Sequence, residues 1–298
     1  MTESTALATS AETSYILPSR PSVWRRLGRT ARTQPVGVVG LFLSAIVVVI
    51  VIFGPYIATD DPNRETPNLL LSPSAENWFG TDEKGRDYFS RTMAGGRITV
   101  AIAVLSLALG TAAGTLIGMV SAYAKLLDLV LQRIIDAILA LPGLFLILLF
   151  ITVFGKDVEI LIYVLALSVT PPLVRIARAS TLSTLTNPYV EAAEVMGASW
   201  IRIILRHVLP NIAPTIGVIF AVGLGNVMLI TGGLGFLGLG VEPPEAEWGR
   251  MIADSRSYIS SYSHMFIFPS IGLALAVLGV NLLGDSLRDL WDPRLRGT

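Results

Sequence analysis

Six apolar stretches alternate with polar segments along the chain, and each is long enough to be a membrane span. They cover residues 36–58, 98–123, 134–154, 158–177, 212–240 and 265–284. A helix needs roughly 20 apolar residues to cross the hydrocarbon core of a bilayer. The pattern predicts an all-α integral membrane protein with six transmembrane helices in one domain, 36–298. The polar, Arg-containing segment 1–35 is expected to be a disordered cytoplasmic tail.

The second stretch contains three glycines at four-residue spacing, Gly110, Gly114 and Gly118. This spacing places all three on one face of a helix, where the absent side chains let another backbone approach closely. We therefore expect this face to pack against a second transmembrane helix.

Prolines interrupt the third and fourth stretches, at Pro142 and at Pro171 and Pro172. They predict kinks within spans rather than helix ends, because neighbouring groups in a bundle can satisfy the freed carbonyls. Pore-lining bends and purely structural kinks both fit this pattern. Pro142, together with the mid-span Asn226 and the segment around Gly232, forms the set of candidate pore or gate residues.

The fifth stretch is longer than an untilted span requires, and its second half is rich in glycine. Because glycine weakens helices, we expect a span from about Ile212 to Ile230, followed by a broken or loosely helical segment buried against protein. A nucleotide-binding loop is the rival interpretation. It is disfavoured because the segment lacks the G-x-x-x-x-G-K-[ST] pattern.

Composition narrows the class of protein further. The chain is 52% hydrophobic and 15% charged, with a mean hydropathy of +0.65, which excludes a soluble enzyme. It has no cysteine, and its two histidines, His207 and His264, lie outside any metal-ligand pattern, so no metal site is predicted. The expected environment is the lipid membrane, with no nucleic-acid partner.

The distribution of basic residues predicts the orientation. With six spans both termini lie on one side, and that side carries 14 of the 22 Lys and Arg residues, against 8 on the other. Cytoplasmic loops are enriched in Lys and Arg. Both termini, and the loop 187–210 between the fourth and fifth spans, are therefore predicted to be cytoplasmic.

This loop has the signals of two short helices. Asn187 and Pro188 suit a helix start, Glu191 and Glu194 favour its first turns, and Gly197 suits a left-handed helix end. Ser199 can cap a second helix that ends before Pro210. Two interpretations remain open on this evidence: a docking element for a partner, in which the small Ala192 and Ala193 allow close approach, and an interfacial amphipathic hairpin.

The order of residues in this loop, Glu191-Ala-Ala followed by Gly197 and Leu209-Pro210, resembles the EAA loop of ABC-importer permeases. Three further segments resemble the C-type permease subunits of dipeptide, oligopeptide and nickel importers. They are Phe79-Gly-Thr-Asp-Glu-Lys-Gly-Arg-Asp-Tyr-Phe-Ser-Arg, Phe236-Leu-Gly-Leu-Gly-Val-Glu-Pro-Pro and Gly284-Asp-Ser-Leu-Arg-Asp-Leu-Trp-Asp-Pro-Arg-Leu-Arg. The chain departs from that branch at Thr231-Gly-Gly, where a glutamate usually precedes the F-L-G-L-G segment.

The resemblance implies half of a peptide-conducting pore in a bacterial inner membrane, with nickel or another solute as the alternative cargo. It implies a homologous B-type permease, two ABC ATPases that bind ATP and Mg²⁺, and an extracytoplasmic substrate-binding protein as partners. This chain itself would bind no cofactor and catalyse no reaction. The ATPase would dock on the residues of the EAA loop: Glu191, Ala192, Ala193, Glu194, Gly197 and Pro210.

Charged residues crowd the segment 78–97, which the orientation places outside the cell. Asp82, Arg86 and Asp87 are its central members. Contact with the binding protein is one interpretation, and a salt-bridged scaffold held by glycine turns is the other.

Two other classes of protein fit the sequence less well. A self-sufficient secondary transporter normally carries ionisable residues inside its spans, whereas Asp136 and Asp285 lie at predicted span ends here. An intramembrane hydrolase needs a Ser/His or Asp/Asp pair near the bilayer centre, which the chain lacks.

Overall fold

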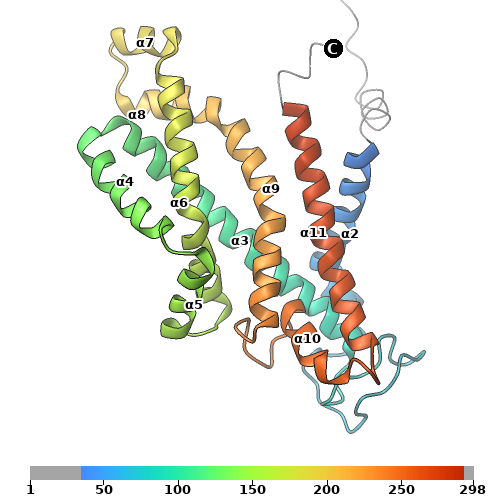
Figure 1. Cartoon of the computed structure of the whole chain (residues 1–298). Helices are drawn as coiled ribbons and strands as arrows, with labels where there is room; N and C mark the ends of the chain where they lie inside the picture. The colour runs from blue at the N-terminus through green and yellow to red at the C-terminus, as the bar shows by residue number, and fades with distance from the viewer. Residues whose placement is uncertain (1–34, 292–298) are drawn as a thin grey trace, which may run out of the picture. The chain divides into compact units, whose positions relative to one another are not determined.

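The computed structural model describes residues 35–291, and the structural statements below concern that range. Its regular structure is helical, with one isolated antiparallel bridge between Thr81 and Asp87 (Figure 1). The predicted tail lies almost entirely outside the described residues, as does the end of the C-terminal motif, 292–298.

Five helical runs are long and apolar enough to cross a membrane. They are α2 (Pro35–Ile57), α3 (Tyr88–Tyr123), α6 (Val158–Leu185), the continuous run of α8 (Trp200–Ile203), η1 (Ile204–Val208) and α9 (Leu209–Phe236), and α11 (His264–Trp291). The pair α4 (Lys125–Leu139) and α5 (Gly143–Phe154) meets the same criterion, but its two helices meet at 89°. The all-helical membrane fold is confirmed, with five candidate spans, or six if the bent α4–α5 pair crosses the membrane as one broken span rather than forming a re-entrant loop.

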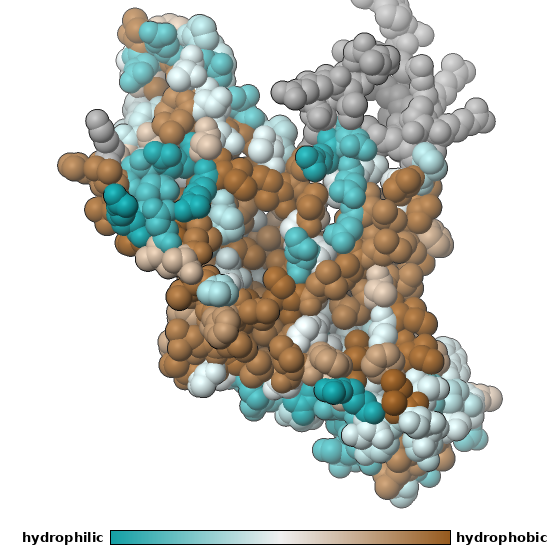
Figure 2. Space-filling view, viewed as in Figure 1, coloured by the Kyte–Doolittle hydropathy of each residue, from teal (hydrophilic) through white to brown (hydrophobic). Residues whose placement is uncertain are grey.

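Three short helices lie between the spans: α7 (Pro188–Val195), α10 (Trp248–Asp254) and the 3₁₀ turn η2 (Ser255–Tyr258). Below, the end of the helix bundle that carries α7 is called the α7 end, and the one that carries α10 and the loop 58–87 is called the α10 end (Figure 1). Figure 2 shows apolar residues across the middle of the face it views and polar residues toward both ends. A bilayer imposes this distribution on a spanning protein.

The α3–α6 pair is the most extensive helix contact, and the glycine face of α3 lies in it. A Cβ on Gly110 would overlap Val169 Cγ2, and one on Gly114 would lie 2.6 Å from Leu173 Cβ. A Cβ on Gly118 would lie 2.6 Å from the Val174 carbonyl oxygen. The helix that this face contacts is therefore α6, and α3 also packs on α9, which in turn packs on α11 and α10.

The prediction that Pro142 kinks a continuous third span is wrong. Pro142 has an extended ψ of 129° and stands immediately before α5, and α4 ends at Leu139. A proline disfavours helical geometry in the residue before it and lacks an N–H group, so the chain turns here instead of bending. By contrast, α6 runs through Pro171 and Pro172 without ending.

The break expected after Ile230 is not found, because α9 continues to Phe236, although the segment is buried against protein as predicted. Its glycines are covered by neighbours: a Cβ on Gly232 would lie 2.7 Å from Leu273 Cδ2 of α11, and Gly249 of α10 approaches the Gly232 carbonyl. Close packing on these helices outweighs the low helix propensity of glycine.

Likewise, α3 begins at Tyr88, ten residues before the predicted start. The Asp87 side chain caps it by accepting a hydrogen bond from Ser90 N at 2.8 Å. The first turns of this helix contain Arg91 and Arg97, which lower their mean hydropathy, and hydropathy alone therefore misplaced its start.

Candidate functional site

The loop between α6 and α9 forms a short helix with a defined end at Gly197. Asn187 precedes α7 in an extended conformation, and Pro188 occupies its first turn. At the other end, Gly197 N donates to Glu194 O at 2.9 Å, and Ala198 N donates to Ala193 O at 3.0 Å. This pair of bonds is the Schellman motif, and the Gly197 φ of +82° is the left-handed geometry it requires.

One face of α7 packs on its own chain. Val190 and Ala193 are buried in a small apolar cluster with Ile203, Val208 and Ala177. Ala193 therefore seats α7 on this chain and is not free to contact a partner, contrary to the role expected for it. Glu191, Ala192 and Glu194 are exposed on the rest of α7.

The exposed side continues into two large apolar side chains that sequence reasoning missed. Val195 is 84% exposed and Met196 is 82% exposed, immediately before Gly197. Trp200, Ile201 and Leu205 add further exposed apolar surface. We call Glu191, Ala192, Glu194, Val195 and Met196 the α7 surface. The sequence did contain a signal for this exposed surface: Val195 and Met196 precede the helix-ending Gly197 in a loop for which no apolar core was predicted.

The second helix of this loop does not end before Pro210, as predicted, but runs on into α9. A π turn, η1, makes the junction, and Leu209 N donates to Ile204 O, five residues back. The wider turn accommodates Pro210, which lacks an N–H group and would crowd the preceding turn of a regular α-helix. The α7 loop is thus joined to a spanning helix by one continuous helical run.

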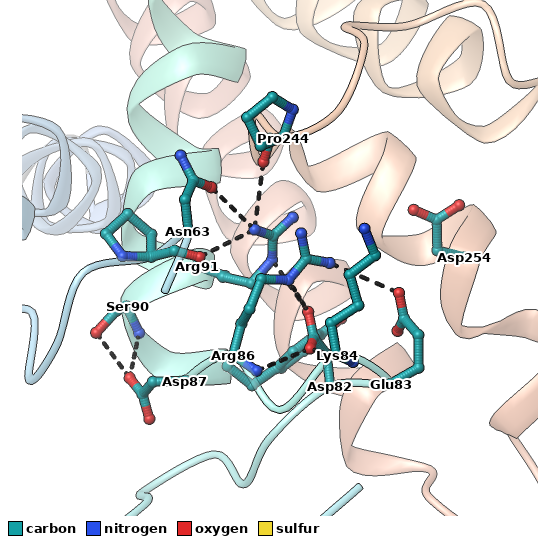
Figure 3. A network of polar contacts seen from close by, with 12 residues as sticks. Asn63, Asp82, Glu83, Lys84, Arg86, Asp87, Ser90, Arg91, Pro244 and Asp254 are labelled. Carbon is teal, nitrogen blue, oxygen red and sulfur yellow. Dashed lines mark hydrogen bonds and ion pairs between the residues drawn. The ribbon is translucent and has the colours of Figure 1, made fainter. Parts of the chain in front are cut away.

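At the α10 end, Asp82 is the centre of a buried ion network (Figure 3). Its Oδ2 accepts from Arg86 Nε at 2.7 Å and lies 3.4 Å from Arg91 Nε. Its Oδ1 accepts from the backbone N–H groups of Lys84 and Arg86, both at 2.9 Å. The Asp82 carboxylate therefore fixes the turn that Gly85 makes with a φ of +71°.

Arg91 ties three segments together. Its Nη1 donates to Pro62 O at 3.0 Å, to Asn63 Oδ1 at 3.2 Å and to Pro244 O at 3.3 Å. These bonds join α3 to the loop 58–87 and to the segment before α10. Asp82, Arg86 and Asp87 are exposed by 1%, 6% and 6% respectively, so a docking protein would find little of them to touch. Their geometry supports the scaffold interpretation.

Glu247 is a second buried carboxylate, and sequence reasoning did not single it out. It caps α10, with Oε1 accepting from Gly249 N and Oε2 from Arg250 N, both at 2.8 Å. Thr99 Oγ1 of α3 lies 3.1 Å from Oε1. Burial raises the pKa of the Glu247 carboxyl to about 7, although these hydrogen bonds favour the charged form.

The same carboxylate lies against α9. A Cβ on Gly235 would overlap Glu247 Oε2, and one on Gly240 would lie 3.1 Å from it. Thr231, at the place where a glutamate was expected, is buried and its hydroxyl donates to Val227 O of its own helix at 2.8 Å. The carboxylate that packs on this glycine-rich segment thus comes from Glu247.

The three candidate pore residues are not brought together. Asn226 is exposed and lines a largely apolar cavity of about 440 Å³ between α3, α5, α6 and α9. Gly143, next to Pro142, lines the same cavity. Gly232 is instead buried against α10 and α11. Of the three, Asn226 alone lines this cavity.

Comparison with known families gives two matches along the chain. The model of the binding-protein-dependent transport system inner membrane component matches residues 114–297. The model of the N-terminal TM domain of oligopeptide transport permease C matches residues 22–73. The first match includes α7 and its exposed surface.

Curated relatives match nearly the whole chain. A dipeptide transport system permease protein from Alkalihalophilus pseudofirmus is 34% identical over 277 residues, which are 92% of this chain and 91% of the relative. Glutathione transport system permease proteins from Escherichia coli and Shigella boydii are each 35% identical over 277 residues, with the same coverage.

Proposed function

Because this chain belongs to the family of binding-protein-dependent inner membrane components, as a C-type permease subunit of an ABC importer, we propose that it forms half of a pore for short peptides. The chain is a non-catalytic, multi-pass membrane subunit. Peptide cargo is supported by the relatives named for dipeptide and for glutathione, which is itself a short peptide. Nickel remains the alternative cargo within the same family.

The observation that carries the proposal is the α7 surface. It is a rigid helix end that exposes two carboxylates and two large apolar side chains, Val195 and Met196, without a partner in the described chain. An exposed apolar group rimmed by charge is typical of a protein interface. This surface docks in a groove of an ABC ATPase, on the cytoplasmic side together with both termini.

ATPase closure is coupled to the spanning helices through the packing of α7. When two ATPases close around ATP and Mg²⁺, they draw together the α7 surfaces of this chain and of a homologous B-type permease. Because α7 is packed on η1, and η1 continues into α9, a shift of α7 moves a spanning helix that lines the cavity at Asn226. Rigid-body movement of packed helices is a common form of alternating access. A substrate-binding protein delivers the cargo at the α10 end.

Substitutions at Gly197 test the coupling. Asparagine tolerates a positive φ, whereas a β-branched residue does not. A Cβ at this position would meet no atom of the described chain within 4 Å, so within this chain the perturbation is one of backbone conformation. We expect Gly197→Val to insert normally and to lose ATP-dependent uptake of a labelled dipeptide in proteoliposomes, while Gly197→Asn keeps most of it.

Three outcomes would each contradict a different part of the proposal. Uptake by Gly197→Val at the wild-type rate would refute the coupling role of α7. Uptake of Ni²⁺ but of no di- or tripeptide by the wild-type complex would replace peptide with nickel as the cargo. Dipeptide uptake that continues without ATP would contradict the importer mechanism.

A further inference from the structure

A cavity at the α10 end is lined by a basic side chain, that of Arg97, which forms no ion pair with the described residues. Its volume is about 630 Å³, within the range of small-molecule sites, and it lies between α2, α3, the start of α6 and the segment before α10. Small residues hollow it out: Gly54 and Ala58 on one side, Ala94 and Ala101 on the face of α3. Arg97 lies on this same helix face.

Arg97 differs from the other basic residues at this end of the bundle. It is exposed, and no carboxylate of the described residues lies within ion-pair distance of it. The remaining described Lys and Arg side chains of the segments 58–97, 155–158 and 237–263 all have partners: Arg64, Lys84, Arg86, Arg91, Lys156, Arg250 and Arg256. The guanidinium of Arg97 thus retains its full set of donors for a ligand.

Carboxylates line the same cavity. Asp61 and Glu245 are exposed and form no ion pair among the described residues, while Asp60 pairs with Arg64. The cavity therefore offers one unpaired guanidinium and two unpaired carboxylates around apolar walls. A ligand that fits this arrangement carries a carboxylate, an ammonium group and a short, compact body.

We propose that this cavity, the Arg97 cavity, is an entry site in which Arg97 binds the terminal carboxylate of a zwitterionic peptide before it is transported. A planar guanidinium binds a carboxylate through two parallel hydrogen bonds, which gives both affinity and orientation. The carboxylates of Asp61 and Glu245 attract the terminal ammonium group of the same peptide. The inference rests on the proposed peptide cargo and names the chemical group by which this chain selects it.

The absence of cysteine allows a direct binding test on the whole importer complex. Ala58→Cys puts one thiol in the cavity wall, and its modification by an anionic thiosulfonate reagent is followed by the mass of this chain, in phosphatidylcholine nanodiscs. We expect dialanine to slow the modification. Dialanine amide, which lacks the carboxylate, should need a roughly tenfold or higher concentration for the same protection, since charge-assisted hydrogen bonds are lost.

Two variants identify the residue responsible. In the Ala58→Cys background, Arg97→Gln should raise the concentration of dialanine needed for protection roughly tenfold and remove the preference for acid over amide. Arg256→Gln is the matched control, because Arg256 is an arginine at the same end that lies over the Phe236 ring, outside the cavity. Ala94→Cys replaces Ala58→Cys if the latter fails to assemble.

Equal protection by acid and amide, or protection that survives Arg97→Gln, would overturn the inference. Protection by phosphatidylglycerol in the nanodisc, and none by dialanine, would also overturn it and assign Arg97 to a lipid headgroup. Because labelling is read without transport, ATP-driven dipeptide uptake is measured separately on the same sample. Uptake without protection refutes the Arg97 cavity alone, whereas failure to take up any peptide refutes the proposed function.

Discussion

The contact between Gly235 and Glu247 yields a prediction that uses two glycines of one helix. Gly235 and Gly233 both lie near the C-terminal end of α9, two residues apart. A Cβ on Gly235 would overlap Glu247 Oε2 and lie 2.7 Å from Arg250 N, whereas a Cβ on Gly233 would meet nothing within 4 Å. Gly235→Ala therefore strains the α9–α10 contact, and Gly233→Ala is its control.

The expected difference follows from three contributions. Replacing glycine by alanine inside a helix stabilises it by about 1 kcal/mol, and this gain applies to both variants and cancels. Overpacking costs about 1–3 kcal/mol, and displacement of the Glu247 cap costs about 0.5–2 kcal/mol more. Gly235→Ala should thus be less stable than Gly233→Ala by about 1.5–5 kcal/mol.

Thermal unfolding of the purified complex in mild detergent measures this difference, and several degrees in Tm are expected. Gly233→Ala should unfold at or slightly above the wild-type temperature. Equal melting temperatures for the two variants would show that Glu247 is not held against α9, and would refute the account of this segment.

Three further predictions concern stability and the α7 junction. Asp82→Ala leaves the buried Arg91 without a carboxylate and leaves Arg86 only its longer contact with Glu83 at 3.6 Å. A loss of about 3–5 kcal/mol is therefore expected in detergent unfolding, against at most about 1 kcal/mol for the exposed Glu65→Ala; similar losses would contradict the scaffold. Because the pKa of Glu247 is about 7 when folded and 4.5 as a free side chain, its proton is held more tightly in the folded state, and stability should fall as pH rises from about 4.5 to 7. Glu247→Gln should remove that part of the pH dependence of Tm, and an unchanged profile would exclude Glu247 as its source. Pro210→Ala should leave uptake within about twofold of wild type, because the helix is already continuous there; loss of uptake would show that the proline itself is required.

The sequence predicts the membrane class and the approximate positions of most spans, because about 20 apolar residues in succession have few other uses. It fails where a local rule competes with packing. Gly232 and Gly235 suggested a broken helix, but α10 and α11 lie close enough against them to keep α9 intact. Conversely, Pro142 suggested a kink, yet the chain turns there by 89°.

At the candidate sites, too, the sequence predicts the features that depend on local residue types and misses those that depend on tertiary packing. Asn187, Pro188 and Gly197 marked the limits of α7, because capping and left-handed geometry depend on local residue types. Whether Ala193 faces a partner or its own chain depends on η1 and α6, which no local pattern describes. Glu247 and Arg97 went unremarked for the same reason: burial of one and lack of a partner for the other are tertiary facts.

Docking of the α7 surface on an ATPase is the central claim, and a single cysteine tests it directly. Met196→Cys, in this otherwise cysteine-free chain, is cross-linked in native membranes with a short bifunctional reagent, and the attached protein is identified by mass spectrometry. Ile259→Cys, an exposed position at the α10 end, is the control. We expect Met196→Cys to capture a protein with a P-loop ATP site and Ile259→Cys to capture none. Capture of no ATPase at Met196, with the chain intact and folded, would contradict the claim.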